Sequence, residues 1–270
     1  MTLPTCETLL LNQEGHALHV TLNRPKARNA MSLTMVNELM AVFESLKDQP
    51  EIRAVVLRGA EKSFCSGGDI KDMGAIHAAA ASGESDNDPY FEFNRTFGRM
   101  ITYVNQAPVV VVAVLEGAVL GGGFGLACIS DVAIASKDAV FGLPETSLGI
   151  PPAQIAPFVV NRIGLTQARR LALLGLRVKG DVAKDLGIVH EVAEDDADLE
   201  AKLEQTLKQI KKSAPKANIV TKKIILSVGN KELETLLDDA AKDFSAAVQG
   251  EEGAEGTLAF IEKRKAQWAQ

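Results

Sequence analysis

The chain has 270 residues, of which 46% are apolar and 24% are charged, and its 35 acidic and 29 basic residues give a net charge of −6. This composition is that of a globular protein, which excludes a disordered or collagen-like chain. The mild acidity argues against a general nucleic-acid binder, because such a protein needs a basic surface for phosphates.

Membrane, disulfide and metal signals are all weak. The longest apolar run, residues 109–115, has seven residues, far short of the roughly 18 that a membrane span requires, and the first residues lack the pattern of a signal peptide. The cysteines Cys6, Cys65 and Cys128 are odd in number and far apart, which fits a reducing compartment. The histidines show no metal-ligand spacing. We expect a cytoplasmic protein without a metal site.

The first elements are a hairpin and a helix. Residues 8–12 and 17–22 flank a glycine-containing turn and predict two paired strands. Residues 23–29 are polar and contain a proline, so we expect a loop, after which Ser32 caps a helix. Apolar residues recur along this helix every three or four positions, at Leu33, Val36, Met40, Phe43 and Leu46.

The middle of the chain alternates strands and helices. We predict a strand at 54–57, a helix at 69–80 and a second helix at 90–105. Between the helices, residues 81–89 are small and polar, so they form either a plain linker or a mobile lid near the substrate.

Residues 109–114 are continuously apolar, which is typical of a strand covered on both faces. A glycine-rich turn at 120–125 follows, then an apolar segment to Ile129 and a strand at 132–135. Strands that alternate with helices imply an α/β sheet core.

From about residue 154 onward the pattern is mostly helical. Two apolar stripes in this part indicate core or a subunit interface rather than a membrane surface, and they comprise Leu199, Leu203, Leu207 and Ile210, then Leu233, Leu236, Leu237, Ala240, Phe244 and Val248. We therefore expect an α/β core over 1–195 and a helical C-terminal region over 196–270.

Two glycine-containing turns follow buried strands, at 63–71 and at 116–125. Glycine lets backbone N–H groups approach a ligand closely, and a following helix adds positive potential. Two such turns that point N–H groups at one oxygen form an oxyanion hole. Taken alone, either segment is better interpreted as a plain tight turn, and neither matches a dinucleotide or phosphate-binding motif.

Glu145 lies in the otherwise apolar, proline-containing segment 141–149. A carboxyl group in such a place tends to have a raised pKa and can exchange protons near neutrality. The alternative interpretation is an ordinary surface-loop glutamate.

With these motifs in place, the chain resembles the crotonase superfamily, also called the enoyl-CoA hydratase/isomerase family. The resemblance runs from about residue 17 to 268 and is specific only as a set. It rests on the region 187–189 and on the stretches LNRPKARNAMS, FCSGGDIKDM, VVAVLEGAVLGGGFGLACISD, FGLPETSLGI and FIEKRKAQW.

The resemblance implies a ββα spiral core with a C-terminal helical region that builds trimers or dimers of trimers. It also implies an acyl-CoA thioester substrate, with no cofactor beyond the CoA that belongs to the substrate. By position, the amides of Gly68 and Gly122 would form the oxyanion hole and Glu145 would be the acid/base. Substrate contacts are implied for Arg24 near the CoA phosphates, for Ser66, Gly68, Asp69, Ile70, Lys71 and Gly122 at the thioester, and for Phe260 and Lys263 from a neighbouring subunit.

One departure from the family pattern concerns the mechanism. Many family hydratases use two glutamates, and the first of them falls on Gly125. Together with segment 149–160, this resembles bacterial glutaconyl-CoA-type hydratases, which act on methylglutaconyl-CoA in leucine breakdown or isohexenylglutaconyl-CoA in acyclic terpene breakdown. A missing side chain at Gly125 would also leave room for a branched β-carbon.

Two alternatives remain at this point: an enoyl-CoA isomerase that uses Glu145 as a proton shuttle, and a non-catalytic acyl-CoA-binding or interaction protein on the same scaffold. Among the other polar groups, we expect Asp131 to fix a turn and Cys65 and Cys128 to fill space. Arg95 and Arg99 are candidate partners for a distal substrate carboxylate.

Overall fold

The computed structural model describes residues 3–69, 71–74, 76 and 88–270. Its strands form one six-stranded sheet, in the order β1-β2-β3-β4-β6-β9, and one three-stranded sheet, in the order β5-β7-β8. The pairs β1–β2 and β7–β8 are antiparallel and the others are parallel. The strands are β1 Leu9–Glu14, β2 Ala17–Leu22, β3 Ala54–Gly59, β4 Val110–Leu115, β5 Ala118–Leu120, β6 Val132–Ser136, β7 Val140–Gly142, β8 Arg177–Lys179 and β9 Glu191–Ala193.

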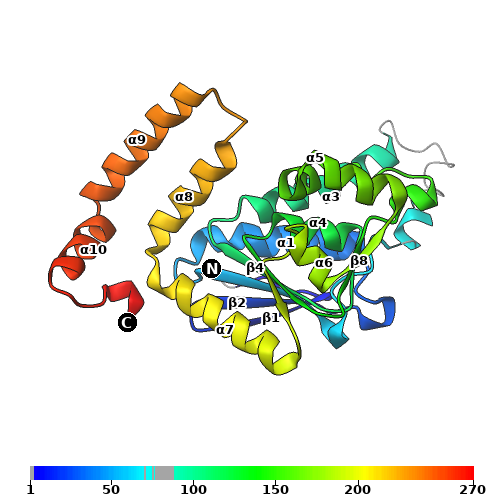
Figure 1. Cartoon of the computed structure of the whole chain (residues 1–270), viewed down its shortest axis with the longest axis horizontal. Helices are drawn as coiled ribbons and strands as arrows, with labels where there is room; N and C mark the ends of the chain where they lie inside the picture. The colour runs from blue at the N-terminus through cyan, green and yellow to red at the C-terminus, as the bar shows by residue number, and fades with distance from the viewer. Residues whose placement is uncertain (1–2, 70, 75, 77–87) are drawn as a thin grey trace.

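Helices cover both faces of the large sheet (Figure 1). One face packs against α1 (Leu33–Ser45), α3 (Pro89–Asn105) and α4 (Gly122–Ile129), and the other against α7 (Asp196–Lys212). Strand β4 is buried on both sides, since alternate residues join the two clusters. The expected α/β core is therefore confirmed. Helix α5 (Ala156–Leu174) packs on α4, and the short α6 (Gly180–Asp185) lies between the strands β8 and β9 in the chain.

The structure confirms the elements predicted for the N-terminal part of the chain. Strands β1 and β2 pair as a hairpin, and Ser32 caps α1, its side chain accepting a hydrogen bond from the amide of Met35 at 3.2 Å. The expected helix at 69–80 is helical over the described residues 71–74 and 76. Asp69 precedes the helical residues, and residues 70, 75 and 77–80, together with residues 81–87 of the expected lid or linker, lie outside the described residues.

Helices α8 (Pro215–Ser227), α9 (Leu233–Gln249) and α10 (Glu251–Ile261) extend away from the core as an arm (Figure 1). The two predicted apolar stripes therefore differ. The stripe on α7 is buried against the sheet, whereas the arm exposes large apolar side chains, namely Leu233, Leu237, Phe244, Val248, Leu258, Phe260 and Ile261. The division of the chain at residue 195 stays a prediction, and α7 itself packs on the core.

One expectation about the second half of the core was wrong. The glycine-rich segment 120–125 is not one turn, because α4 begins inside it at Gly122. Within the helix, glycine is required for packing, since a Cβ on Gly123 would lie 2.7 Å from the Cβ of Cys65. The part after residue 154 is mostly helical, as expected. It also contains β8 and β9, which have three residues each and are ordered by pairing with distant strands rather than by a local pattern.

Candidate active site

The two glycine turns meet because the first pairs with β5. The amide of Cys65 donates to the carbonyl of Ala118 at 2.8 Å, and the amide of Leu120 donates to the carbonyl of Cys65 at 2.9 Å. Residues 65–68 therefore run beside β5 and arrive at the point where the second turn begins. Backbone pairing between segments far apart in sequence thus creates the site.

The opposite edge of the first turn is held by Met31. Its amide donates to the carbonyl of Gly67 and its carbonyl accepts from the amide of Asp69, both at 2.9 Å. In this parallel bridge the N–H of Gly68 points away from Met31. It has no acceptor among the described residues, so it is available to a ligand.

Gly122 presents the second amide. The preceding Gly121 has φ +52° and ψ −116°, a conformation that reverses the chain and that side-chain-bearing residues avoid. Gly122 is the first residue of α4, where the N–H has no partner within the helix. A Cβ on Gly122 would lie 3.0 Å from the ring of Phe97 and 3.1 Å from the sulfur of Met31, so a side chain here would force these neighbours to shift.

Strand β7 carries Glu145 to the same place. It pairs with β5 in parallel, and the amide of Gly121 donates to the carbonyl of Gly142 at 3.0 Å. Three residues later, Oε1 of Glu145 lies 2.8 Å from where a Cβ of Gly121 would be. Glycine at 121 therefore makes space for the carboxylate.

The Glu145 carboxyl group is poorly solvated. Its Oε2 is buried and has no hydrogen-bond partner among the described residues. Burial raises the pKa of this carboxyl above its ordinary value, and a hydrogen bond from its own backbone amide offsets only part of that effect. Such a group can take up and release a proton near neutral pH.

Gly68, Gly122 and Glu145 all line one pocket of about 200 Å³. Its walls are mainly apolar, and the other polar side chains in them are Ser66, Asn94 and Gln154. The apolar part of the lining comprises Met31, Leu33, Val36, Met73, Phe93, Phe97, Pro144, Leu148, Ile150, Pro151, Pro152, Ala153 and Ile155.

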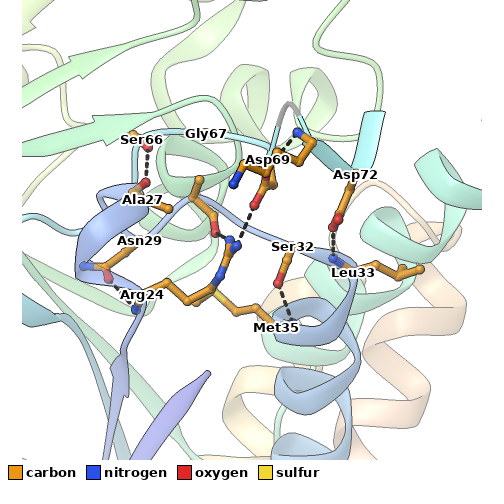
Figure 2. A network of polar contacts seen from close by, with 12 residues as sticks. Arg24, Ala27, Asn29, Ser32, Leu33, Met35, Ser66, Gly67, Asp69 and Asp72 are labelled. Atoms are coloured by element: carbon orange, nitrogen blue, oxygen red, sulfur yellow. Dashed lines mark hydrogen bonds and ion pairs between the residues drawn. The ribbon is translucent and has the colours of Figure 1, made fainter. Parts of the chain in front are cut away.

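Arg24 and Asp69 form an ion pair that supports the first glycine turn (Figure 2). Nη2 of Arg24 lies 2.6 Å from Oδ2 of Asp69, and Nη1 donates to the carbonyl of Ala30 at 2.5 Å. The other Asp69 oxygen accepts the amide of Lys71 at 2.8 Å. Burial alone would raise the pKa of Asp69, but the bonds from Arg24 and Lys71 outweigh it and hold that pKa below its ordinary value.

The same network continues through the loop before α1 (Figure 2). Asn29 is fully buried, and its Nδ2 donates to the carbonyls of Ala60 and Ser63 at 3.0 and 2.6 Å. The hydroxyl of Ser66 donates to the carbonyl of Ala27 at 3.2 Å. These contacts fix the position of the turn that presents the Gly68 amide.

The expected substrate residues thus fall into groups. Ser66, Gly68 and Gly122 line the pocket, whereas Arg24 and Asp69 lie behind its wall and bond to each other. Lys71 is exposed beside the first turn, and Ile70 lies outside the described residues. Phe260, which is 85% exposed, and Lys263 lie at the end of the arm, and neither is among the residues that line the pocket.

The space at Gly125 is not open to a substrate, which corrects the expectation of room for a branched β-carbon. A Cβ on Gly125 would lie 2.5 Å from Cγ2 of Ile155. Ile155 is buried and lines the pocket. The side chain lost at 125 is therefore replaced by an apolar one from the segment before α5.

The surroundings of Cys65, Cys128 and Asp131 favour structural roles for these side chains. Burial raises the pKa of the Cys65 thiol to about 11 and that of Cys128 to about 12, so both stay protonated at neutral pH. Asp131 accepts from the amide of Val111 and from Nζ of Lys222, each at 2.7 Å, and so links β4 to α8. It does not line the pocket.

Across the described ranges, no group of three or more His, Cys, Asp or Glu side chains is placed to hold a metal ion. Nor does any helix within those ranges combine the length and apolarity needed to cross a bilayer.

Sequence reasoning missed much of the pocket wall. Phe93 and Phe97 are four residues apart on α3, a spacing that places them on one helical face. Asn94 and Gln154 belong to no recognisable sequence motif, because they come together only when α3 packs against the segment before α5.

Comparison with known proteins gives consistent results. The Enoyl-CoA hydratase/isomerase family profile matches residues 12–270. A short-chain-enoyl-CoA hydratase from Clostridium acetobutylicum is 30% identical over 95% of each chain, and a peroxisomal Delta(3,5)-Delta(2,4)-dienoyl-CoA isomerase from Arabidopsis thaliana is 31% identical over 98% of this chain and 97% of its own.

Two solved structures are more similar still. Pseudomonas aeruginosa AtuE is 57% identical with a TM-score of 0.94, over 98% of this chain and 100% of that one. An enoyl-CoA hydratase/isomerase from Marinobacter aquaeolei is 55% identical with the same TM-score of 0.94 and the same coverage of 98% and 100%.

Proposed function

Since this chain belongs to the enoyl-CoA hydratase/isomerase family, we propose that it adds water to the double bond of a 2-enoyl-CoA thioester, with Glu145 as the acid/base. The observation that carries this proposal is the Glu145 carboxylate, whose Oε2 is buried, has no hydrogen-bond partner among the described residues, and lies on a pocket shared with two glycine amides. A buried, unpaired carboxylate is costly, and proton transfer is the function that such a group serves.

The amides of Gly68 and Gly122 would hold the thioester oxygen. As water adds to the β-carbon, negative charge moves onto this oxygen and an enolate forms. Two N–H groups that have no other acceptor in the described part of the chain would stabilise that charge, and each such donor is worth roughly 10²–10³ in rate.

Glu145 would then carry the proton. Its carboxylate removes a proton from water while the oxygen attacks the β-carbon. The same carboxyl group returns that proton to the α-carbon, so the net change is the addition of one water molecule. No second carboxylate is required, which fits the glycine at 125 and the Ile155 methyl group that fills its space.

The substrate that we favour is a branched glutaconyl-CoA-type thioester, such as methylglutaconyl- or isohexenylglutaconyl-CoA of leucine or acyclic terpene catabolism. The motif resemblance supports it, and the mainly apolar walls of the pocket suit the hydrocarbon part of such an acyl group. We further propose a cytoplasmic trimer or dimer of trimers, supported by the exposed apolar side chains on the arm. CoA is part of the substrate, and no separate cofactor is proposed.

An isomerase remains the second candidate, because a single carboxylate that shuttles one proton also suffices to move a double bond, and a dienoyl-CoA isomerase is among the relatives. The experiment that separates the candidates is a panel of enoyl-CoA thioesters incubated in ¹⁸O-labelled water and analysed by mass. A hydratase incorporates the label into the product and an isomerase does not. Binding of thioesters without any turnover would favour the non-catalytic alternative and refute the proposal.

A further inference from the structure

A chain of polar side chains crosses the wall of the pocket between α3 and the segment before α5. Nη1 of Arg95 donates to Oε1 of Gln154 at 2.7 Å, and Nε2 of Gln154 donates to Oδ1 of Asn94 at 2.7 Å. Asn94 and Gln154 line the pocket, whereas Arg95 lies behind them.

Arg95 fixes the direction of every hydrogen bond in this row of side chains. A guanidinium group donates hydrogen bonds and accepts none, so the oxygen of Gln154 must face Arg95 and its amide nitrogen must face Asn94. The oxygen of Asn94 is used by that contact. Its Nδ2 is left as a donor at the pocket wall, without an acceptor among the described residues.

Arg95 gives this row of side chains a positive charge. Among the described residues, Arg95 forms no ion pair, whereas Arg99, one turn later on α3, lies 3.5 Å from Glu92. A row of donors that starts at an unpaired cation attracts an anion rather than another donor.

Gly98 makes this arrangement possible. A Cβ there would lie 2.0 Å from Oε1 of Gln154 and 2.7 Å from Nη1 of Arg95. The Gln154 side chain therefore reaches Arg95 only because α3 has no side chain at this position.

We propose that Asn94 binds a carboxylate at the distal end of the acyl group, with Gln154 and Arg95 as positioning residues that orient its amide. This inference rests on the proposed function and adds a specificity determinant to it. It explains how a pocket with apolar walls could accept a second acid group: one oriented amide donor, backed by a cation, meets the carboxylate.

The test compares two substrates of similar size, crotonyl-CoA and glutaconyl-CoA, in full-length enzyme. Asn94→Leu should lower the ratio of kcat/KM for glutaconyl-CoA to that for crotonyl-CoA by roughly 10- to 100-fold, the effect of losing a hydrogen bond to a charged group. Arg95→Gln should lower the same ratio less, through a higher KM for glutaconyl-CoA. The matched control is Arg99→Gln on the same helix, which should leave the ratio unchanged.

Gly98→Ala provides an independent check that leaves every polar group present, because its methyl group displaces Gln154 from Arg95. It should lower the ratio in the same direction as Arg95→Gln. An unchanged ratio in Asn94→Leu and Gly98→Ala, with wild-type enzyme hydrating both substrates, overturns the inference and leaves the hydratase function standing. If wild-type enzyme hydrates crotonyl-CoA but not glutaconyl-CoA, the inference about Asn94 is likewise overturned and the hydratase function stands. If wild-type enzyme hydrates no thioester, both the inference and the hydratase function are overturned.

Discussion

The replacement Glu145→Gln tests the central chemical claim, since it keeps the shape of the side chain and removes its ability to carry a proton. General acid–base catalysis by one side chain contributes roughly 10²–10⁴ in rate. We therefore expect turnover of a 2-enoyl-CoA to fall by at least about 100-fold. Thioester binding should largely remain, because the two glycine amides are unchanged.

The same replacement should raise stability at neutral pH. Burial raises the pKa of Glu145 above its ordinary value of 4.5, so the folded state holds the proton more tightly than the unfolded state. The carboxylate therefore costs stability as the pH rises above 4.5, and the cost is complete above the folded-state pKa. Removing it should raise the free energy of unfolding at pH 8, and the gain should vanish near pH 4.

Both effects have direct assays. Loss of enoyl-thioester absorbance gives kcat/KM against pH, and wild-type activity should rise with pH along a limb whose midpoint lies above the ordinary glutamate pKa. That limb should be missing from any residual activity of the variant. Urea unfolding at pH 8 and pH 4 gives the stability difference. Glu44→Gln, an exposed glutamate on α1, is the control and should change neither quantity.

A near-native rate for Glu145→Gln would remove this residue from the mechanism. A variant that is less stable than wild type at pH 8 would show that the carboxylate has a stabilising partner and would refute the argument from burial.

Three further predictions concern the surroundings of the site. Arg24→Met leaves Asp69 buried without its 2.6 Å partner. The free energy of unfolding in urea should fall by about 3 kcal/mol at pH 7. The loss should be smaller at pH 3, because the lowered pKa of Asp69 stabilises the fold only where that carboxyl is ionised. An equal cost at both pH values would contradict the ion-pair reasoning. Gly121→Ala places a methyl group 2.8 Å from Oε1 of Glu145. It should lower kcat at least about 10-fold and lower the free energy of unfolding by roughly 1–3 kcal/mol through backbone strain; native kinetics would refute the importance of this contact. Gly125→Glu should lower unfolding free energy by about 2 kcal/mol through overpacking against Ile155 and should not speed hydration, whereas a faster enzyme would show that the space is available.

The features with local causes were predictable from the sequence. The cap at Ser32, the hairpin and the doubly covered strand β4 follow from residue types at fixed spacing, and the structure confirms them. The glycines of the two turns were also recognisable, because a close backbone approach needs glycine wherever it occurs.

Features that depend on distant partners were not predictable. Strands β8 and β9 are ordered only by the strands beside them. The space at Gly125 looked empty because nothing in the local sequence shows that Ile155 fills it. Arg24 was expected at the CoA phosphates, and only the fold reveals its bond to Asp69.

The hydrogen bond from the amide of Gly121 to the carbonyl of Gly142 links the two segments that carry the proposed reacting groups. The residue after this donor offers the Gly122 amide, and the third residue after the acceptor is Glu145. Thermal motion of the small sheet therefore moves both groups together and preserves their alignment. The alignment of the two groups therefore depends on the pairing of β5 with β7 and is lost when that pairing breaks.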